Sequence, residues 1–144
     1  MAFRWGIMGA GSIAGKFIDA INRTESAEIV AVGSRDTARA EAFAQRHGVP
    51  AAYGSYEAML SAGGLDAVYI ATRTDSHAAL TRLCIAHGVP VLCEKAMFIS
   101  SAEATLVIAP MATTYSGFSL LWARARRHRS SAASEITGVC SSGR

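Results

Sequence analysis

A short apolar run that stops at a group of glycines opens the chain. Residues 3–8 are apolar enough to form a buried strand, and the sequence continues Gly9-Ala10-Gly11-Ser12. Apolar side chains then recur at four-residue spacing, as on a helix that packs along one face: Ile13, Phe17 and Ile21. A strand, a glycine turn and a helix in this order predict the first unit of an α/β domain.

The composition of this turn suits a bound phosphate. Gly9 allows a sharp turn, Gly11 allows the backbone to approach a bound group, and Ala14 is small enough to pack the helix against a sheet. The amides of Ser12 and Ile13 at the helix start would face a pyrophosphate. The same pattern also serves α/β domains for geometry alone, so this stretch by itself leaves both interpretations open.

Strands and helices alternate along the next hundred residues. Strands are expected at residues 28–34, 51–53, 67–71 and 89–93, with helices at residues 36–47, 55–61, 76–87 and 102–109. Asp36 and Ser55 are expected helix caps, and Gly48 is an expected left-handed helix exit. Right-handed crossovers then give a doubly wound parallel sheet, with any ligand at the carboxyl ends of its strands.

The last part of the chain has no such pattern. Pro110 is expected to end the last helix, residues 116–122 form one more short strand or nothing, and the arginine-rich end has the composition of a disordered tail. We therefore expect a domain over residues 1–109 and an irregular, basic segment over 110–144. The abrupt change at Pro110 favours the hypothesis of a shifted reading frame.

Charge and composition exclude several classes of protein. The formal net charge is +3, but residues 1–122 have a balance of −1 and residues 123–144 a balance of +4, so the domain itself gives no sign of nucleic-acid binding. No apolar run approaches the roughly 18 residues of a membrane span. Met1 lies almost on the first strand and leaves no room for a signal peptide, which favours a cytoplasmic location. The three cysteines have neither a metal-binding nor a disulfide spacing.

The end of the second strand indicates which dinucleotide would fit. An NAD site uses a carboxylate there to bind the ribose 2′-hydroxyl, whereas this sequence has Gly33-Ser34-Arg35. Ser34 can donate a hydrogen bond to a 2′-phosphate, and the Arg35 guanidinium can pair with it and lie over the adenine. These residues favour NADP over NAD. The alternative is that Arg35 is a solvated loop residue and Asp36 binds the ribose.

Chemistry-bearing side chains also follow the fourth and fifth strands. Thr72 and His77 follow the fourth, and Glu94 and Lys95 follow the fifth. Lys95 can hydrogen-bond a substrate hydroxyl or a developing alkoxide beside a nicotinamide. The alternatives are a surface position without a task for His77 and a simple strand-end salt bridge for Glu94 and Lys95.

Taken together, the ends of the strands resemble those of the glucose–fructose oxidoreductase, inositol dehydrogenase and rhizopine catabolism (Gfo/Idh/MocA) family. The matching pieces lie between residues 3 and 109, and their order is more specific than any one of them: Gly9-Ala10-Gly11-Ser12-Ile13-Ala14, Val32-Gly33-Ser34-Arg35, Tyr53-Gly54-Ser55-Tyr56, Ala71-Thr72 with His77, and Val91-Leu92-Cys93-Glu94-Lys95. Within the family, the sequence looks most like dimeric dihydrodiol dehydrogenases and NADP-dependent xylose dehydrogenases.

The resemblance implies a Rossmann domain that holds NADP, with Lys95 at the family's catalytic lysine position. It places Thr72, His77 and Glu94 on the nicotinamide side, and it implies a sugar or diol substrate and a homo-oligomer. Three departures stand out. Ala96 replaces the proline of the family's Glu-Lys-Pro, and Arg73 replaces a proline after Ala-Thr. The family's C-terminal α/β substrate domain, with its catalytic histidine, has no counterpart after residue 109.

Two functional interpretations follow. In the first, the chain is the cofactor domain of an NADP-dependent oxidoreductase, and turnover by these 144 residues is in doubt. In the second, it is a non-catalytic dinucleotide-binding or interaction module whose basic tail contacts a partner or nucleic acid.

Overall fold

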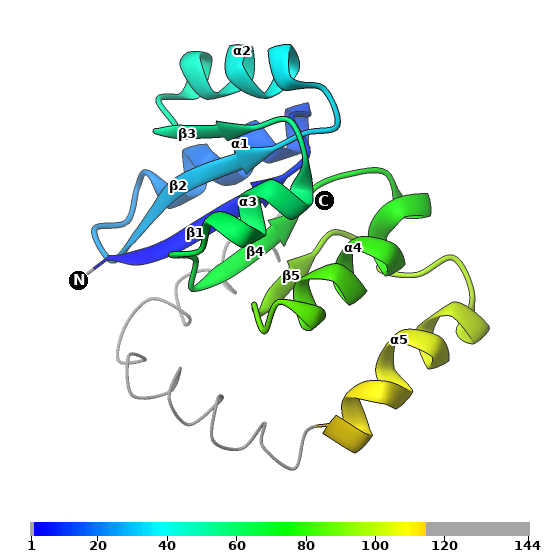
Figure 1. Ribbon diagram of the computed structural model, residues 1–144. Coiled ribbons are helices and arrows are strands. Elements are labelled where there is room, and N and C mark those ends of the chain that lie inside the picture. The colour runs from blue at the N-terminus through cyan, green and yellow to red at the C-terminus, as the bar shows by residue number, and fades with distance from the viewer. Residues whose placement is uncertain (1, 115–144) are drawn as a thin grey trace, which may run out of the picture. The chain divides into compact units, whose positions relative to one another are not determined.

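The chain forms a five-stranded parallel sheet. The computed structural model describes residues 2–114, with side chains as far as Val107. The strand order is β3-β2-β1-β4-β5, and every neighbouring pair is parallel. The strands are β1 Phe3–Met8, β2 Ala27–Gly33, β3 Ala51–Tyr53, β4 Ala67–Ile70 and β5 Val91–Cys93. The chain moves outward from β1 to β3 and then returns to β4 on the other side of β1, so the strand order reverses between β1 and β4 (Figure 1).

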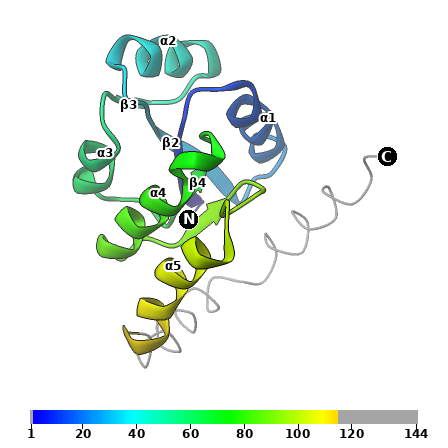
Figure 2. The same cartoon turned by 90° about the vertical axis from the view of Figure 1, so that its right-hand side faces the viewer.

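Helices connect the strands and cover both faces of the sheet. They are α1 Ser12–Ile21, α2 Thr37–His47, α3 Tyr56–Ala62 and α4 Thr74–Ala86, and a further helix, α5 Ser101–Thr114, follows the last strand. Figure 2 shows α1 on one side of the sheet and α3 and α4 on the other. This arrangement confirms the predicted doubly wound fold, because right-handed crossovers change face when the direction of travel along the sheet reverses.

Side-chain caps and a glycine exit fix the helix ends where the sequence predicts them. The Asp36 carboxylate accepts a hydrogen bond from the Arg39 amide at 3.2 Å, and the Ser55 hydroxyl accepts one from the Ala58 amide at 3.0 Å. Gly48 ends α2 with φ +68°, a conformation that costs other residues strain. The three predictions are confirmed.

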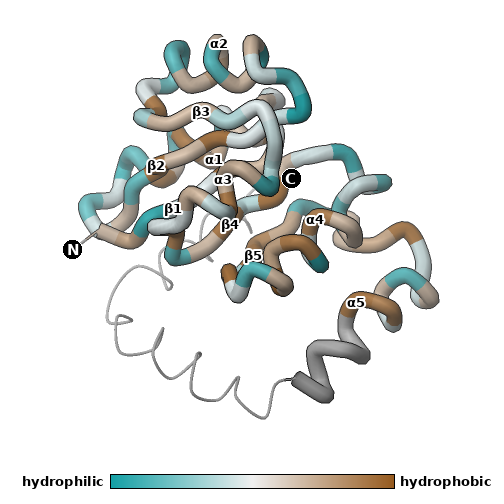
Figure 3. Tube along the Cα trace, in the orientation of Figure 1, coloured by the Kyte–Doolittle hydropathy of each residue, from teal (hydrophilic) through white to brown (hydrophobic). Residues whose placement is uncertain are grey.

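The core lies between the central strands and the helices on either side. Figure 3 shows apolar residues along the central strands, and also on α4 and on the segment that leads to α5. One buried cluster joins β1, β2 and β4 to α3 and α4: Met8, Ala31, Met59, Leu60, Val68, Ile70, Leu80 and Cys84. β4 is buried along its whole length, which agrees with the near-continuous apolar runs of parallel strands.

The end of the last helix differs from the prediction. α5 continues to Thr114 and so passes through Pro110, where the sequence predicts its end. A proline removes one backbone hydrogen bond and bends a helix, but the helix can continue on both sides of it. The capping spacing at its start is confirmed, because the Ser100 hydroxyl accepts from the Glu103 amide at 3.1 Å.

The sheet and its connecting helices lie within one unit, Met1–Val107. The domain boundary at residue 109 stays a prediction, and the possible strand at 116–122 and the basic tail fall outside the described residues. Within residues 2–114, no helix is long and apolar enough to cross a membrane.

Candidate functional site

The turn after β1 is packed tightly against the end of β4. Gly9 has φ +105°, and a Cβ atom there would lie 2.9 Å from the Ala71 carbonyl oxygen and 3.1 Å from the Thr72 methyl group. The Gly9 amide donates to the Gly33 oxygen at 2.9 Å, and the Ala71 amide donates to the Met8 oxygen at 2.9 Å. Gly9 is therefore required by the fold itself, where the ends of three strands meet.

The second glycine of this turn faces open space. Gly11 is the N-cap of α1 with φ −110°, and a Cβ built on it would meet no atom within 4 Å. Among the described residues no side chain caps α1, in contrast to α2 and α3. Ser12 is exposed, Ile13 is 39% exposed, and Ala14 is fully buried against the sheet. The uncapped end of α1 thus presents backbone amides and the positive end of its dipole to the solvent.

The turn after β2 holds a buried serine and an exposed arginine. Ser34 is 7% exposed, and its hydroxyl accepts from the Asp36 amide at 3.3 Å, which leaves the hydroxyl hydrogen available for another acceptor. Arg35 is exposed. The Asp36 carboxylate caps α2, as the sequence predicts.

A second arginine, Arg39, lies near this turn and is missed by the sequence analysis. It is on the first turn of α2, and its guanidinium lies 3.4 Å from the Ala10 carbonyl oxygen in the glycine turn. Burial raises the pKa of the Tyr56 hydroxyl, and the nearby Arg35 and Arg39 guanidiniums partly lower it. Arg39 therefore reaches the glycine turn after β1, and Arg35, which follows β2, lies near the same tyrosine as Arg39. In the sequence, the four-residue spacing of Arg35 and Arg39 at the start of a helix is the signal that could have identified Arg39.

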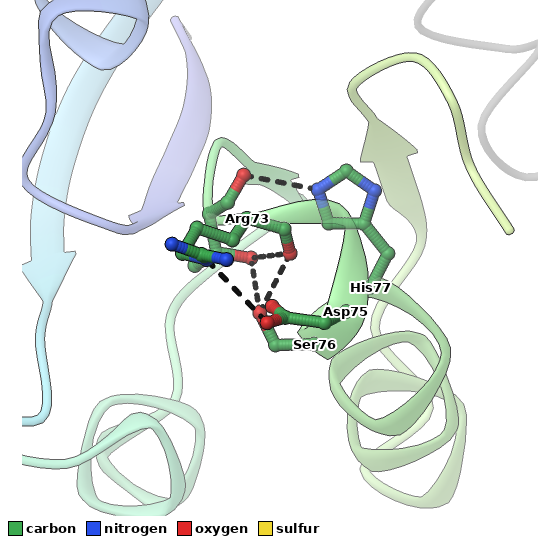
Figure 4. Close-up of polar contacts among 5 residues, drawn as sticks. Arg73, Asp75, Ser76 and His77 are labelled. Carbon is green, nitrogen blue, oxygen red and sulfur yellow. Dashed lines mark hydrogen bonds and ion pairs between the residues drawn. The ribbon is translucent and has the colours of Figure 1, made fainter. Parts of the chain in front are cut away.

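Beyond β4 the chain makes a polar turn into α4. The Ser76 hydroxyl donates to the Arg73 carbonyl oxygen at 2.8 Å and lies 3.0 Å from the Thr72 hydroxyl, as Figure 4 shows. Arg73 and Asp75 form an ion pair at 3.4 Å, but both side chains are largely exposed, so this pair contributes little to stability.

His77 lies inside this turn. The side chain is 1% exposed, so the interpretation of His77 as a surface residue is wrong. Its Nε2 atom lies 3.1 Å from the Thr72 carbonyl oxygen, and Figure 4 draws this contact as the dashed line from the His77 ring. Its Nδ1 atom lies 2.9 Å from the carbonyl oxygen of Ala96, in the turn after β5. The histidine connects the ends of two neighbouring strands.

The turn after β5 holds the two predicted charged residues in different environments. The Glu94 carboxylate accepts a hydrogen bond from the Tyr69 hydroxyl and another from the Lys95 amide at 3.3 Å. Tyr69 is itself stacked on Phe17 of α1, with ring centroids 4.0 Å apart. Lys95 is exposed, and the Lys95–Ala96 peptide bond is cis. Within residues 2–114 the only ion pair joins Arg73 and Asp75, so the predicted strand-end salt bridge is not formed.

Comparison with known proteins identifies this arrangement. A sequence profile described as the GFO_IDH_MocA oxidoreductase family, NAD-binding Rossmann fold, matches residues 3–116. The chain belongs to the Gfo/Idh/MocA family. The matched segment extends past residue 109, where the resemblance seen in the sequence stops.

The curated relatives of this Gfo/Idh/MocA domain include trans-1,2-dihydrobenzene-1,2-diol dehydrogenases. The mouse (Mus musculus) protein is 44% identical over 111 residues, and the human (Homo sapiens) protein is 41% identical over 112 residues. Each match covers 76% of this chain and 33% of the relative. The chain therefore spans about a third of the length of these curated relatives.

Solved structures share the fold, and those compared below contain NAD⁺ in one case and NADP in the other. An oxidoreductase from Agrobacterium radiobacter in complex with NAD⁺, L-tartaric acid and magnesium superposes with a TM-score of 0.71 at 30% identity, covering 76% of this chain and 32% of that one. KijD10, a 3-ketoreductase from Actinomadura kijaniata in complex with NADP, gives a TM-score of 0.70 at 28% identity, covering 76% and 35%. The profile and these structures together identify the chain as an NAD(P)-binding Rossmann domain of the Gfo/Idh/MocA oxidoreductase family.

The geometry of the domain itself also fits a bound dinucleotide, independently of these relatives. The uncapped amides at the start of α1 face open space, as an anionic pyrophosphate requires. Each predicted site residue follows β1, β2, β4 or β5, whose carboxyl ends lie at one edge of the sheet.

Proposed function

We propose that the chain is the NADP-binding part of an oxidoreductase that acts on a sugar or a diol. The observation that carries this proposal is the pair of arginines, Arg35 and Arg39, beside the glycine turn at the carboxyl ends of β1 and β2. The dihydrodiol dehydrogenases among the relatives support the substrate class. When bound, NADP supplies or accepts the hydride.

The preference for NADP over NAD rests on charge. A 2′-phosphate carries close to two negative charges, so the Arg35 and Arg39 guanidiniums would each form a charge-assisted hydrogen bond to it, and the Ser34 hydroxyl would donate a third. The carboxylate that could instead bind a ribose hydroxyl, that of Asp36, already caps α2. A hydrogen bond to a charged group contributes about 1.5–3 kcal/mol, and we take the lower end because both guanidiniums are exposed.

A titration with NADPH and NADH tests the cofactor. We expect tighter binding of NADPH, and we expect Arg39→Ala to weaken NADPH about tenfold while changing NADH less than threefold. Arg35→Ala should act in the same direction. Arg82→Ala on α4 is the matched control, because it removes the same charge from an exposed position outside the β1 and β2 turns. Equal affinity for the two dinucleotides in the unchanged protein would contradict the NADP assignment.

We also propose a role for Lys95 in handling the substrate oxygen. Its ammonium is exposed and has no ion-pair partner within the described residues, so it is available to donate to a substrate hydroxyl or alkoxide. Glu94 would support this role by keeping its carboxylate on Tyr69, away from the ammonium. Lys95→Met removes the donor while keeping most of the side-chain volume.

Turnover by the chain would exclude a module that only binds the dinucleotide. The purified chain is assayed with NADP and either xylose or a trans-dihydrodiol, in parallel with Lys95→Met. Oxidation that disappears in Lys95→Met would support the catalytic proposal. Tight NADPH binding with no turnover fits both the cofactor part of a larger enzyme and the second candidate, a module that only binds the dinucleotide; this chain spans only a third of the length of its relatives.

A further inference from the structure

We propose that His77 is a positioning residue that holds the turn carrying Lys95 against the turn after β4. The importance of that position rests on the proposed function of Lys95, whereas the link itself rests on contacts within the domain. Both ring nitrogens are used: Nδ1 faces the Ala96 carbonyl oxygen at 2.9 Å and Nε2 faces the Thr72 carbonyl oxygen at 3.1 Å.

The environment of His77 makes this link rigid. The side chain is 1% exposed, and it projects from the first turns of α4, whose own position is fixed by the buried residues Leu80 and Cys84 further along the helix. A planar ring held between two backbone carbonyl groups fixes the distance between the two turns. A carbonyl oxygen can only accept, and a neutral imidazole has a single N–H, so the neutral ring donates to one of the two oxygens and only the imidazolium donates to both.

The turn after β5 has little else to hold it. β5 is a strand of three residues at the edge of the sheet, and its last ladder bond is from the Glu94 amide to the Ile70 oxygen at 3.0 Å. Within residues 2–114, the contact with His77 is the only hydrogen bond seen from residues 95–97 to any residue other than Glu94. Lys95, Ala96 and Met97 are all exposed.

The other end of the link reaches the glycine turn. Thr72 lies directly against Gly9, where a Cβ atom would come within 3.1 Å of the Thr72 methyl group. A continuous set of contacts therefore runs from Gly9 through Thr72 and His77 to Ala96, the residue after Lys95. Through this set, His77 places the lysine relative to the turn that would hold the pyrophosphate.

Two amide side chains can separate the two contacts of the ring. The amide nitrogen of asparagine reaches about the position of Nδ1, and that of glutamine reaches about the position of Nε2. His77→Asn should thus keep the bond to Ala96, and His77→Gln should keep the bond to Thr72 and lose the one to Ala96. His77→Ala loses both.

Hydrogen–deuterium exchange of the peptide containing residues 94–98 measures the link without any cofactor. The readout is the Glu94 amide, whose bond to the Ile70 oxygen is the last of β5; we expect it to exchange at least tenfold faster in His77→Ala and His77→Gln, and within threefold of the unchanged protein in His77→Asn. His87→Gln, at the exposed far end of the same helix, should change nothing and is the matched control. If His77→Ala fails to fold, the comparison of the asparagine and glutamine variants decides the question.

Ligand binding then tests whether the link serves the cofactor site. 2′,5′-ADP contains only the adenosine end of NADP, so its affinity should stay within twofold in His77→Gln while that of NADPH falls at least fivefold. Equal weakening of both ligands would indicate a general structural role and overturn the proposal, as would unchanged exchange at residues 94–98 in His77→Gln. If the unchanged protein binds neither ligand, the proposed function fails, whereas the exchange comparison still decides whether His77 holds this turn.

Discussion

Replacing each glycine of the β1–α1 turn with alanine should separate a glycine that the fold needs from one that a ligand needs. Gly9 has φ +105°, and its added Cβ would lie 2.9 Å from the Ala71 carbonyl oxygen. Gly11 has φ −110°, which any residue adopts, and its added Cβ would meet no protein atom within 4 Å. The two substitutions are chemically identical, so any difference between them reflects their surroundings.

The cost of Gly9→Ala can be worked out from these two observations. A positive φ costs a non-glycine residue about 1–2 kcal/mol. The close contact involves a backbone carbonyl, which cannot turn aside as a side chain can, so overpacking adds about 1–3 kcal/mol. The sum of about 2–5 kcal/mol is a large part of the 5–15 kcal/mol that stabilises a typical domain. Gly11→Ala changes only an N-cap and should cost less than about 1 kcal/mol.

Thermal unfolding by circular dichroism and titration with NADPH give the two readouts. At about 4–8 °C per kcal/mol for a domain of this size, Gly9→Ala should lower Tm by about 10 °C or more. Gly11→Ala should lower Tm by only a few degrees and weaken NADPH at least tenfold, because the methyl group enters the space in front of the first-turn amides. A similar fall in Tm for both variants would refute the structural reasoning, and an unchanged NADPH affinity in Gly11→Ala would refute the pyrophosphate position.

Three further predictions concern the surrounding structure. Asp36→Ala should lower the free energy of unfolding by about 1 kcal/mol, measured by urea denaturation, because it removes the cap of α2. Burial raises the pKa of Cys84 to about 12 and that of Cys93 to about 11, so both thiols ionise at lower pH in the unfolded chain than in the folded one. The free energy of unfolding should therefore be at its full value below about pH 8.5 and fall as the pH rises toward 11. In urea titrations at successive pH values, the Cys84→Ser/Cys93→Ser variant should show a weaker decline. Tyr69→Phe should cost about 1–2 kcal/mol by the same assay, because the Glu94 carboxylate loses a partner; no change would argue against that bond.

Much of the fold is encoded in local signals that the sequence displays directly. The apolar runs of β1 and β4, the caps Asp36 and Ser55 and the exit at Gly48 each act over a few residues, and each was predicted correctly. The end of α5 was not, because a proline is a strong but not absolute helix breaker and the residues around it decide whether the helix resumes.

The sequence predicts the location of the candidate site at the strand ends, but only some of the contacts within it. Because the strands are parallel, the residues after β1, β2, β4 and β5 had to meet at one edge. The reach of Arg39 back to Ala10 depends on the direction of a long side chain on α2, which no local pattern gives. The burial of His77 depends on a turn nineteen residues later in the chain that accepts a hydrogen bond from its ring.

The site has two halves that lie on opposite sides of the point where the strand order reverses. The turns of β1 and β2 carry the glycines and the arginines, and the turns of β4 and β5 carry His77 and Lys95. The halves meet where Gly9 packs against Thr72, at the strand neighbours β1 and β4, which is where open α/β sheets bind their ligands. Cofactor preference and handling of the substrate oxygen therefore depend on different segments of the chain. Substitutions at Arg39 should shift the choice between NADPH and NADH while leaving hydrogen exchange at residues 94–98 unchanged. Substitutions at His77 should accelerate hydrogen exchange at residues 94–98 and leave the choice between NADPH and NADH unchanged.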